Sequence, residues 1–163
     1  MLRTLLVLAF LVIAALPARA GWLVPLDKAN MEPQELLSWA SIAATSSMTF
    51  DPANPAGNFM TARGSFTDKG WAELLEATSK LGVLIAVYTD KQAVVATLAG
   101  EPEVQSAGAQ GGLYRWTVIM PLLLTYSSGS TKTLNVTLSI QRSTAPENVD
   151  GIAISEWRQA EAQ

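Results

Sequence analysis

The side chains that most often do chemistry in proteins are missing from this sequence. Its 163 residues include no cysteine and no histidine. Without a thiol there is no disulfide, no thiolate metal site and no cysteine nucleophile, and without an imidazole the most common general base is absent. Serine–histidine and cysteine–histidine catalysis are therefore excluded, as are zinc sites of the usual nitrogen and sulfur type. The composition disfavours an enzyme, which would need an Asp, Glu or Tyr base.

Carboxylates are the remaining groups that could do acid–base or metal chemistry. Glu101 and Glu103 fall on one face of a predicted strand, Glu73 and Glu76 fall on one face of a predicted helix, and Asp68 lies nearby. The sequence holds no Asp-x-Asp-x-Asp-Gly loop that would bind a hard cation. We interpret these acids as solvated surface or as complements to a helix dipole. No catalytic, cofactor-binding or metal-binding residue is predicted.

A glycine-rich stretch, Gly-Ala-Gln-Gly-Gly at 108–112, has the composition of a phosphate-binding loop. Loops of that kind open a helix and are followed by Lys and Ser or Thr, whereas this stretch precedes a predicted strand. We interpret it as a plain loop between strands.

The first twenty residues have the layout of a secretory signal peptide. Arg3 makes the start positive, an apolar run covers 5–16, and small residues lead up to a cleavage site between Ala20 and Gly21. An uncleaved membrane anchor is the alternative, but twelve residues cover only about 18 Å as a helix, against a hydrocarbon core of ~30 Å. We therefore expect export to the periplasm with 1–20 removed, and anchoring in the inner membrane only if cleavage fails.

The mature chain is acidic. Of the eleven basic residues, Arg3 and Arg19 lie in the signal segment, so 21–163 holds nine basic residues against fourteen acidic ones, a net charge of −5. The basic residues are scattered, which argues against nucleic acid as a direct partner. With 49% of the residues hydrophobic, the length suits a single domain over 21–163 with its own core.

Helical signals fill the first part of the mature chain. Apolar residues recur with the period of a helix over 32–46. A second helix should begin at Thr67, because its hydroxyl can cap the first turn and because Phe66 and Trp71 can form a hydrophobic staple around it. Gly82 is placed to end this helix.

From residue 83 onward the apolar period changes to two, which is typical of strands. The expected strands are 83–89, 93–98, 101–107, 113–126, 131–142 and 151–157. Within the strand 131–142, apolar and polar residues alternate strictly over 134–141, so one face of that strand should pack on a core. Helices followed by a meander of strands predict an α+β fold, with the N-terminal helices packed on one face of a curved antiparallel sheet.

Aromatic residues are the candidates for protein contacts. Trp39, Trp71 and Trp116 are predicted to lie in the core. Candidates for exposed interaction groups are Trp22, Tyr126 and Trp157, since Trp and Tyr are enriched at interfaces.

The segment 116–126 has almost no polar alternation. It is either a strand buried on both faces or an apolar sheet edge that binds a partner, and Pro121 favours the edge.

Several blocks of the sequence resemble the periplasmic domain of DotI/IcmL proteins, which are components of type IVB secretion and have the homologue TraM in conjugation. The resemblance covers 21–157. The residues that carry it are Trp39, Phe66, Thr67, Gly70, Trp71, Tyr114, Trp116, Pro121 and Gly151. It implies a nuclear-transport-factor-like, VirB-type periplasmic fold, no catalysis and no cofactor. It also implies assembly with other copies and with apparatus subunits, including membrane-anchored DotI/IcmL-like proteins.

Two features depart from that family. Its members usually carry a cytoplasmic tail and a full transmembrane helix before this domain, where this chain has a short signal-like segment. The stretch 51–58 also lacks the aromatic, arginine-bearing sequence expected after the first helix.

The first functional hypothesis is a non-enzymatic periplasmic assembly or scaffold subunit of a type IVB secretion or conjugal transfer system, which presents a sheet edge and an apolar strand to its partners. The second is a domain that binds a small apolar ligand between the helices and the sheet, in a pocket lined by Trp39, Trp71 and Met120. An enzyme with a carboxylate or tyrosine base is a third.

Overall fold

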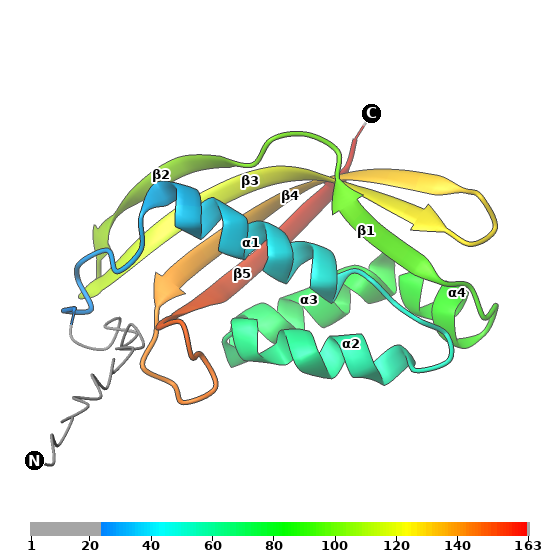
Figure 1. The fold of residues 1–163 in the computed structure, drawn as a ribbon, viewed down its shortest axis with the longest axis horizontal. Helices are drawn as coiled ribbons and strands as arrows, with labels where there is room; N and C mark the ends of the chain where they lie inside the picture. Colours follow the sequence, from blue (N-terminus) through cyan, green and yellow to red (C-terminus); the bar gives the residue numbers. More distant parts are fainter. Residues whose placement is uncertain (1–23, 163) are drawn as a thin grey trace, which may run out of the picture.

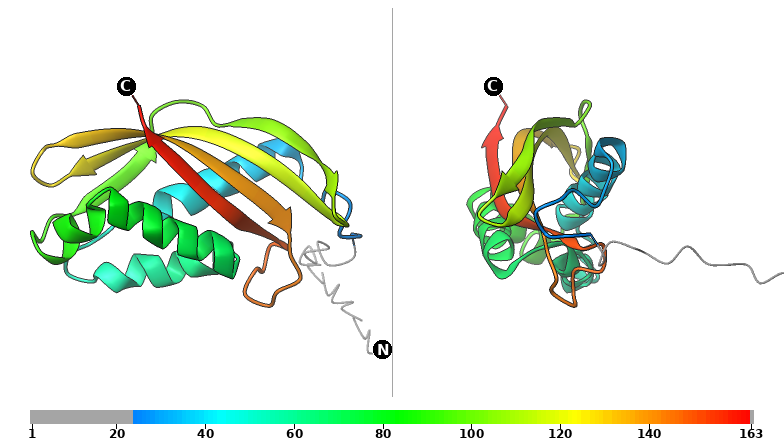
Figure 2. Two further views of the ribbon diagram at one scale, coloured as in Figure 1. Left: turned by 180° about the vertical axis from the view of Figure 1, so that it is seen from behind. Right: turned by 90° about the vertical axis from the view of Figure 1, so that its left-hand side faces the viewer.

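The computed structural model describes residues 24–162. In chain order its elements are α1 (Pro33–Ser47), α2 (Pro55–Ala62), a short 3-10 turn (Arg63–Ser65), α3 (Asp68–Lys80), α4 (Val83–Tyr88), β1 (Val94–Leu98), β2 (Glu103–Gln110), β3 (Leu113–Tyr126), β4 (Thr131–Arg142) and β5 (Ile152–Glu161) (Figure 1). The strands form one curved antiparallel sheet, and the helices gather on one of its faces (Figure 2). The predicted α+β class is confirmed.

The sheet is four strands wide, because β1 and β2 share one side of β3. β1 pairs with the second half of β3, β2 pairs with the first half, and β4 and β5 follow on the other side. Alternate residues of β3 and β4 point toward the helices and are buried, whereas the residues between them lie on a face that no helix covers. We call this second surface the helix-free face.

Pro121 does not mark a sheet edge, so the prediction of an apolar edge at 116–126 is wrong. β3 is a central strand, paired on both sides. Proline is tolerated there because the neighbouring side is interrupted between β1 and β2, at the place where a ladder donor is missing. The carbonyl of Pro121 still accepts a hydrogen bond from the Ala99 N–H at 2.9 Å.

The predicted strand over 83–89 is also wrong, because this segment forms α4. Gly82 takes a left-handed conformation (φ 74°) and leads the chain from the end of α3 directly into the next helix. Val83 and Val87 are buried while Ile85 between them is exposed, which is a helical pattern of burial. In so short an apolar run, periodicity could not distinguish the two structures.

The start of α3 agrees with its sequence signals. The hydroxyl of Thr67 accepts the Gly70 N–H at 3.1 Å, and the rings of Phe66 and Trp71 lie 5.7 Å apart in edge-on contact. The Thr67 N–H donates to the Ile154 carbonyl at 3.0 Å, so the cap also attaches α3 to β5.

We expect Thr67→Ala to lower the free energy of unfolding by about 1 kcal/mol, because one N–H of the first turn loses its acceptor. Thr67→Ser keeps the hydroxyl and should stay within a few tenths of a kcal/mol, on the order of the spread between good caps. Urea unfolding of both variants checks this. An equal loss in both would mean that the methyl group, and not the cap, carries the effect.

Candidate interaction surface

Most of the aromatic motif residues lie in the core. Phe66, Trp116 and Trp157 are buried, and Trp71 packs partly buried against the same cluster. Trp157 is only 3% exposed, so its prediction as an exposed interaction group is wrong. Its position in β5 lies opposite Leu138, which points toward the helices, and its Nε1–H donates to Gln159 at 2.8 Å.

These rings form a continuous row that connects the layers. Neighbouring ring centroids lie 4.9 Å apart for Phe50 and Phe59, 5.1 Å for Phe59 and Trp71, 5.7 Å for Trp71 and Phe66, and 6.2 Å for Phe66 and Trp157. The row runs from the segment beside β1, through α2 and the α3 region, to β5. Contacts of this kind stabilise beyond the area they bury, so the motif aromatics join helices to sheet and do not offer a free surface.

Of the other two predicted interaction groups, Tyr126 and Trp22, the structure describes only Tyr126. Tyr126 is half-buried at the end of β3, and burial raises the pKa of its phenol. Trp22 and the cleavage site at Ala20 and Gly21 lie outside the described residues.

Two further motif residues lie at the end of the sheet near the start of the described chain. The Tyr114 N–H donates to the Leu26 carbonyl at 2.6 Å, and the Tyr114 ring lies 4.9 Å from that of Trp116. Gly151 adopts a positive φ of 71° just before β5, a conformation that favours glycine. Both residues therefore have local structural roles.

Arg142 is a buried cation that the sequence analysis did not single out. It ends β4, is 2% exposed, and its guanidinium donates to the carbonyls of Val24 at 3.1 Å, Pro25 at 3.3 Å, Lys28 at 2.9 Å and Gly151 at 3.1 Å. Desolvation lowers its pKa from the ordinary arginine value. Arg142 thus holds the first described segment of the chain, residues 24–28, against the end of the sheet.

Two more side chains fasten the same end of the molecule. The Asn30 amide donates to the Asp150 carbonyl at 3.0 Å, and the Trp39 Nε1–H donates to the Asp150 carboxylate at 3.0 Å. The loop before β5 therefore connects the lead-in segment with α1. Trp39 acts as a hydrogen-bonded support at this end.

A charged cluster lies on the helix-free face, where α3 begins beside β5. Glu156 accepts hydrogen bonds from Lys69 at 2.5 Å, from Arg158 at 3.0 Å and from the Ser139 hydroxyl at 3.4 Å. The hydrogen bond from Lys69 is the main reason that the pKa of Glu156 lies below its usual value, and the charges of Lys69 and Arg158 act in the same direction. The same contact raises the pKa of Lys69.

Stability should depend on pH through Glu156. Because its pKa is lower in the folded state, its contribution is present above the unfolded value and is lost as the pH falls through the folded one. We expect Glu156→Gln to lower the free energy of unfolding at pH 7 by less than about 1 kcal/mol, since the pair is partly exposed. At pH 3 the variant and the parent should converge.

Urea unfolding at the two pH values tests this expectation. Glu101→Gln is the matched control, because Glu101 is exposed and forms no ion pair with the described residues. A loss from Glu156→Gln that is equal at both pH values would contradict the linkage.

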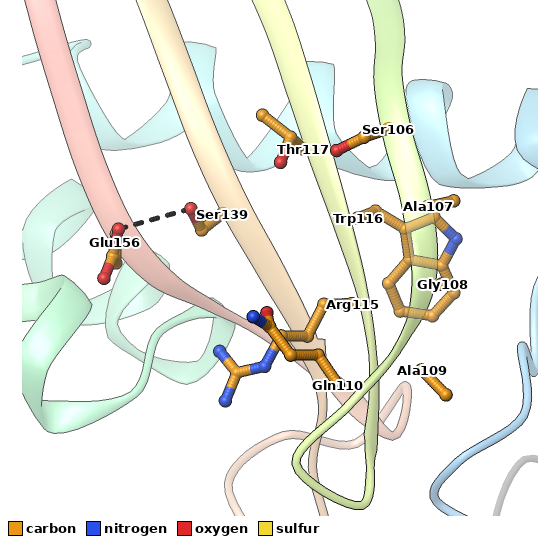
Figure 3. Close-up of a pocket in the computed structure, with 10 residues that line it drawn as sticks. All are labelled: Ser106, Ala107, Gly108, Ala109, Gln110, Arg115, Trp116, Thr117, Ser139 and Glu156. Atoms are coloured by element: carbon orange, nitrogen blue, oxygen red, sulfur yellow. Dashed lines mark hydrogen bonds between the residues drawn. The ribbon is translucent and has the colours of Figure 1, made fainter.

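The helix-free face is hollowed in two places beside this cluster. One open hollow of about 460 Å³ lies over β2, β3 and β4 and is lined mainly by small and polar residues, among them Ser106, Gln110, Thr117 and Ser139 (Figure 3). The other, of about 580 Å³, lies toward the start of α3. Arg115 and Glu156 line both.

The three residues predicted to line an apolar pocket between the helices and the sheet have other contacts. Met120 is buried in the core, Trp71 packs against aromatic rings, and Trp39 binds Asp150. None of these three lines the hollows described above.

The acidic side chains of the described part of the chain are spread out or engaged with cations. Residues 24–162 contain no group of three acidic side chains placed to bind a metal ion. Three of the acids considered in the sequence form ion pairs: Glu76 with Lys80, Glu73 with Lys69 and Asp68 with Arg63. Across those same residues, no helix has the length and apolar character needed to cross a membrane.

Solved structures share this arrangement of helices and sheet. The periplasmic domain of DotI is 30% identical over 81% of this chain and 97% of its own length, with a TM-score of 0.75. A periplasmic fragment of TraM is 20% identical over 81% of this chain and all of its own length (TM-score 0.72), and an IcmL-like type IV secretion protein from Legionella pneumophila is 20% identical over 82% and 95% (TM-score 0.72). A search of curated proteins gives no match.

The fold therefore defines a class, the periplasmic domains of type IV secretion components. A family model described as "Type-IV b secretion system, inner-membrane complex component" matches residues 13–161. The chain belongs to this DotI/IcmL family.

Proposed function

We propose that this chain is a non-enzymatic periplasmic assembly subunit of a type IVB secretion or conjugal transfer apparatus. The observation that carries the proposal is the family match over 13–161, which spans nearly all of the described domain. The chemistry of the chain supports it, because a sequence without histidine or cysteine lacks the usual catalytic groups.

We infer further that residues 1–20 direct export and are removed after Ala20. The mature domain then assembles with copies of itself or with membrane-anchored DotI/IcmL-like subunits. Its net charge of −5 argues against direct binding of nucleic acid. Large exposed apolar side chains supply contact surface for protein partners. They include Ile42, Met60, Ile85, Tyr88, Val95 and Val149.

The test is a crosslinking experiment in the native host. A C-terminal tag is added to the full chain, proteins are crosslinked in living cells, and the tagged complexes are purified and identified by mass spectrometry. The N-terminal peptide is read from the same sample. We expect other subunits of the secretion or conjugation apparatus bound to a chain that begins at Gly21.

Two outcomes would contradict parts of this proposal. A chain that crosslinks to no apparatus subunit would not be an assembly component. A chain that retains residues 1–20 would be membrane-anchored, and the inferred cleavage would be wrong. A signal-sequence exchange provides the control, because a cleavable leader from an unrelated exported protein should preserve function only if residues 1–20 serve export alone.

A further inference from the structure

Among the arginines that the structure describes, Arg115 alone has no partner. Arg63 pairs with Asp68, Arg158 pairs with Glu156, and Arg142 binds backbone carbonyls. Arg115 forms no ion pair or hydrogen bond with the described residues, and its Nε is buried without an acceptor. A buried N–H without an acceptor lowers the stability of the folded state, so a ligand that supplies the acceptor would remove this cost.

The surroundings of Arg115 suit an ionic ligand. Its side chain extends from β3 across the face of β4 toward the β5 side of the sheet, and it lines both hollows (Figure 3). Hydroxyl and amide groups line the same hollows: Ser106, Gln110, Thr117 and Ser139 line the first, and Gln141 lines the second. A site with so many polar groups and few apolar ones offers hydrogen bonds and little contact for an apolar molecule.

The charge balance at this place favours an anion. The negative charge of Glu156 is already shared by Lys69 and Arg158, and the Asp68 carboxylate at the rim binds Arg63. The Glu73 carboxylate accepts a hydrogen bond from the Trp157 backbone N–H at 2.9 Å and forms an ion pair with Lys69 at 3.6 Å. With Arg63 and Asp68 included, four cations therefore face three carboxylates, and Arg115 is the cation without a carboxylate partner among the described residues. A guanidinium binds a carboxylate through two parallel hydrogen bonds, which matches its planar geometry.

We propose that the hollows beside Arg115 form a carboxylate-binding site whose occupant is an acidic side chain of a partner subunit of the apparatus. The same face of β3 carries the half-buried apolar side chains of Ile119, Pro121 and Leu123. An arginine next to apolar groups on an open face is the usual composition of a protein interface. The inference deepens the proposed function and rests on it.

Gln141 provides a sharp variant for the test. It lies directly opposite Arg115 in the β3–β4 register, on the same face. Gln141→Glu is nearly isosteric and places a carboxylate within reach of Arg115, so the protein would fill its own site. Asn135→Asp is the matched control, because it adds the same charge on the same strand and face but lies opposite Pro121. Arg115→Gln removes the cation.

The experiment uses the full chain in its host, with the photocrosslinking residue p-benzoylphenylalanine in place of exposed Ser106 at the rim. We expect crosslinks to a peptide of an apparatus subunit that contains Asp or Glu. Their yield should fall by about tenfold or more in Arg115→Gln and Gln141→Glu, and should be unchanged in Asn135→Asp. Arg115→Glu should lose the crosslink and regain it when the partner's acidic residue is replaced by Arg.

Several results would overturn the inference. One is a crosslink yield that is insensitive to Arg115→Gln and Gln141→Glu. Others are crosslinks from the rim to lipid or to a second copy of this chain. If the Arg115 Nε–H signal in an NMR titration responds to sodium glutarate or phosphate while the partner crosslink stays unchanged, the ligand is a free anion. Loss of all apparatus subunits from the tagged parent would instead contradict the proposed function itself.

Folding of the variants is checked by thermal melting. Gln141→Glu should melt no lower than the parent, because it gives the guanidinium a partner. A lower melting temperature than that of Asn135→Asp would show that Arg115 does not accept a carboxylate in this position, and would also overturn the inference.

Discussion

Replacing Arg142 with alanine is expected to lower the free energy of unfolding by about 3 kcal/mol and to release residues 24–28 from the end of the sheet. The guanidinium binds three carbonyls of that segment and one before β5. Hydrogen bonds from a charged donor contribute more than neutral ones, and four of them depend on this side chain. Part of the loss is offset, because freed carbonyls can bind water once the segment leaves the surface.

Two measurements separate release of the segment from global destabilisation. Urea unfolding reports the free energy, and trypsin cleavage after Lys28 under native conditions reports how often the segment detaches. We expect the cleavage rate to rise much more than the global stability predicts. Arg142→Lys is the matched control and should be intermediate, since an ammonium has three donors and cannot span the fork-like set of carbonyls. Unchanged cleavage in Arg142→Ala would contradict the assigned role.

This prediction bears on how the domain connects to whatever precedes it. Residues 24–28 are the first described part of the chain, and the Tyr114 N–H binds the same segment through Leu26. A segment held by both a buried cation and a β-strand amide fixes the direction in which the chain enters the domain. Loss of the Arg142 contacts would leave the segment held only by the Tyr114–Leu26 hydrogen bond before the next attachment at Asn30, and the direction of entry would be less fixed.

Much of the fold follows from local sequence signals. β3 and β4 have the residue limits that the change of period predicts, and α3 begins at the Thr67 cap. These succeeded because both strands are long apolar or alternating runs bounded by clear turn signals, with strict alternation over 134–141 in β4, and because a cap with its staple marks the start of a helix. The short apolar run at α4 has no such length, so its tertiary surroundings determined its structure.

Tertiary context also decides what the sequence could not settle for the site. The alternation of β4 puts position 142 on the buried face, and a charged residue at such a position is a signal for Arg142 that the sequence analysis did not use. Arg115 gave no comparable signal, because a lone arginine in a strand is most often solvated. Its significance depends on which residues surround it across β2, β4 and β5, and on Lys69 and Arg158 having already engaged Glu156.

The burial of Trp157 also depends on tertiary context that the sequence does not show. A tryptophan near the end of a chain is a reasonable candidate for an exposed contact. The register shift beside Ile154 sets which face the later residues of β5 occupy, and it turns Trp157 toward the helices. Such irregularities of pairing depend on both strands and are not visible in one of them.

The second large effect is expected at Gly70, where alanine should destabilise the protein by about 2–3 kcal/mol. In an exposed helix the same change stabilises, by about 0.5–1 kcal/mol. Here the first turn of α3 lies directly on the backbone of β5: a Cβ on Gly70 would overlap the Ile154 carbonyl oxygen and lie 3.0 Å from its carbon.

Neither partner in this overlap can easily move. The Ile154 carbonyl accepts the Thr67 N–H at 3.0 Å, and Ile154 itself pairs with Ile140 of β4. The overlap could be removed only if α3 moved away from β5. That movement would break the hydrogen bond from the Thr67 N–H to the Ile154 carbonyl and loosen the aromatic packing at Phe66. The cost is therefore one of backbone displacement, which side-chain rotamers cannot absorb.

Ala72→Gly, at an exposed position two residues further along α3, measures helix propensity alone and should cost about 1 kcal/mol. If propensity alone governed this helix, Gly70→Ala would stabilise and Ala72→Gly would destabilise. The structure predicts that both destabilise, with Gly70→Ala the larger. Chemical denaturation of the two variants gives the sign of each change in stability, and a stabilised Gly70→Ala would mean that α3 and β5 are not in backbone contact.

That contact joins the helix layer to the sheet beside the charged cluster. Its loss should therefore also raise hydrogen exchange at the Thr67 and Trp157 amides, whereas exchange at the centre of β3 should be unchanged.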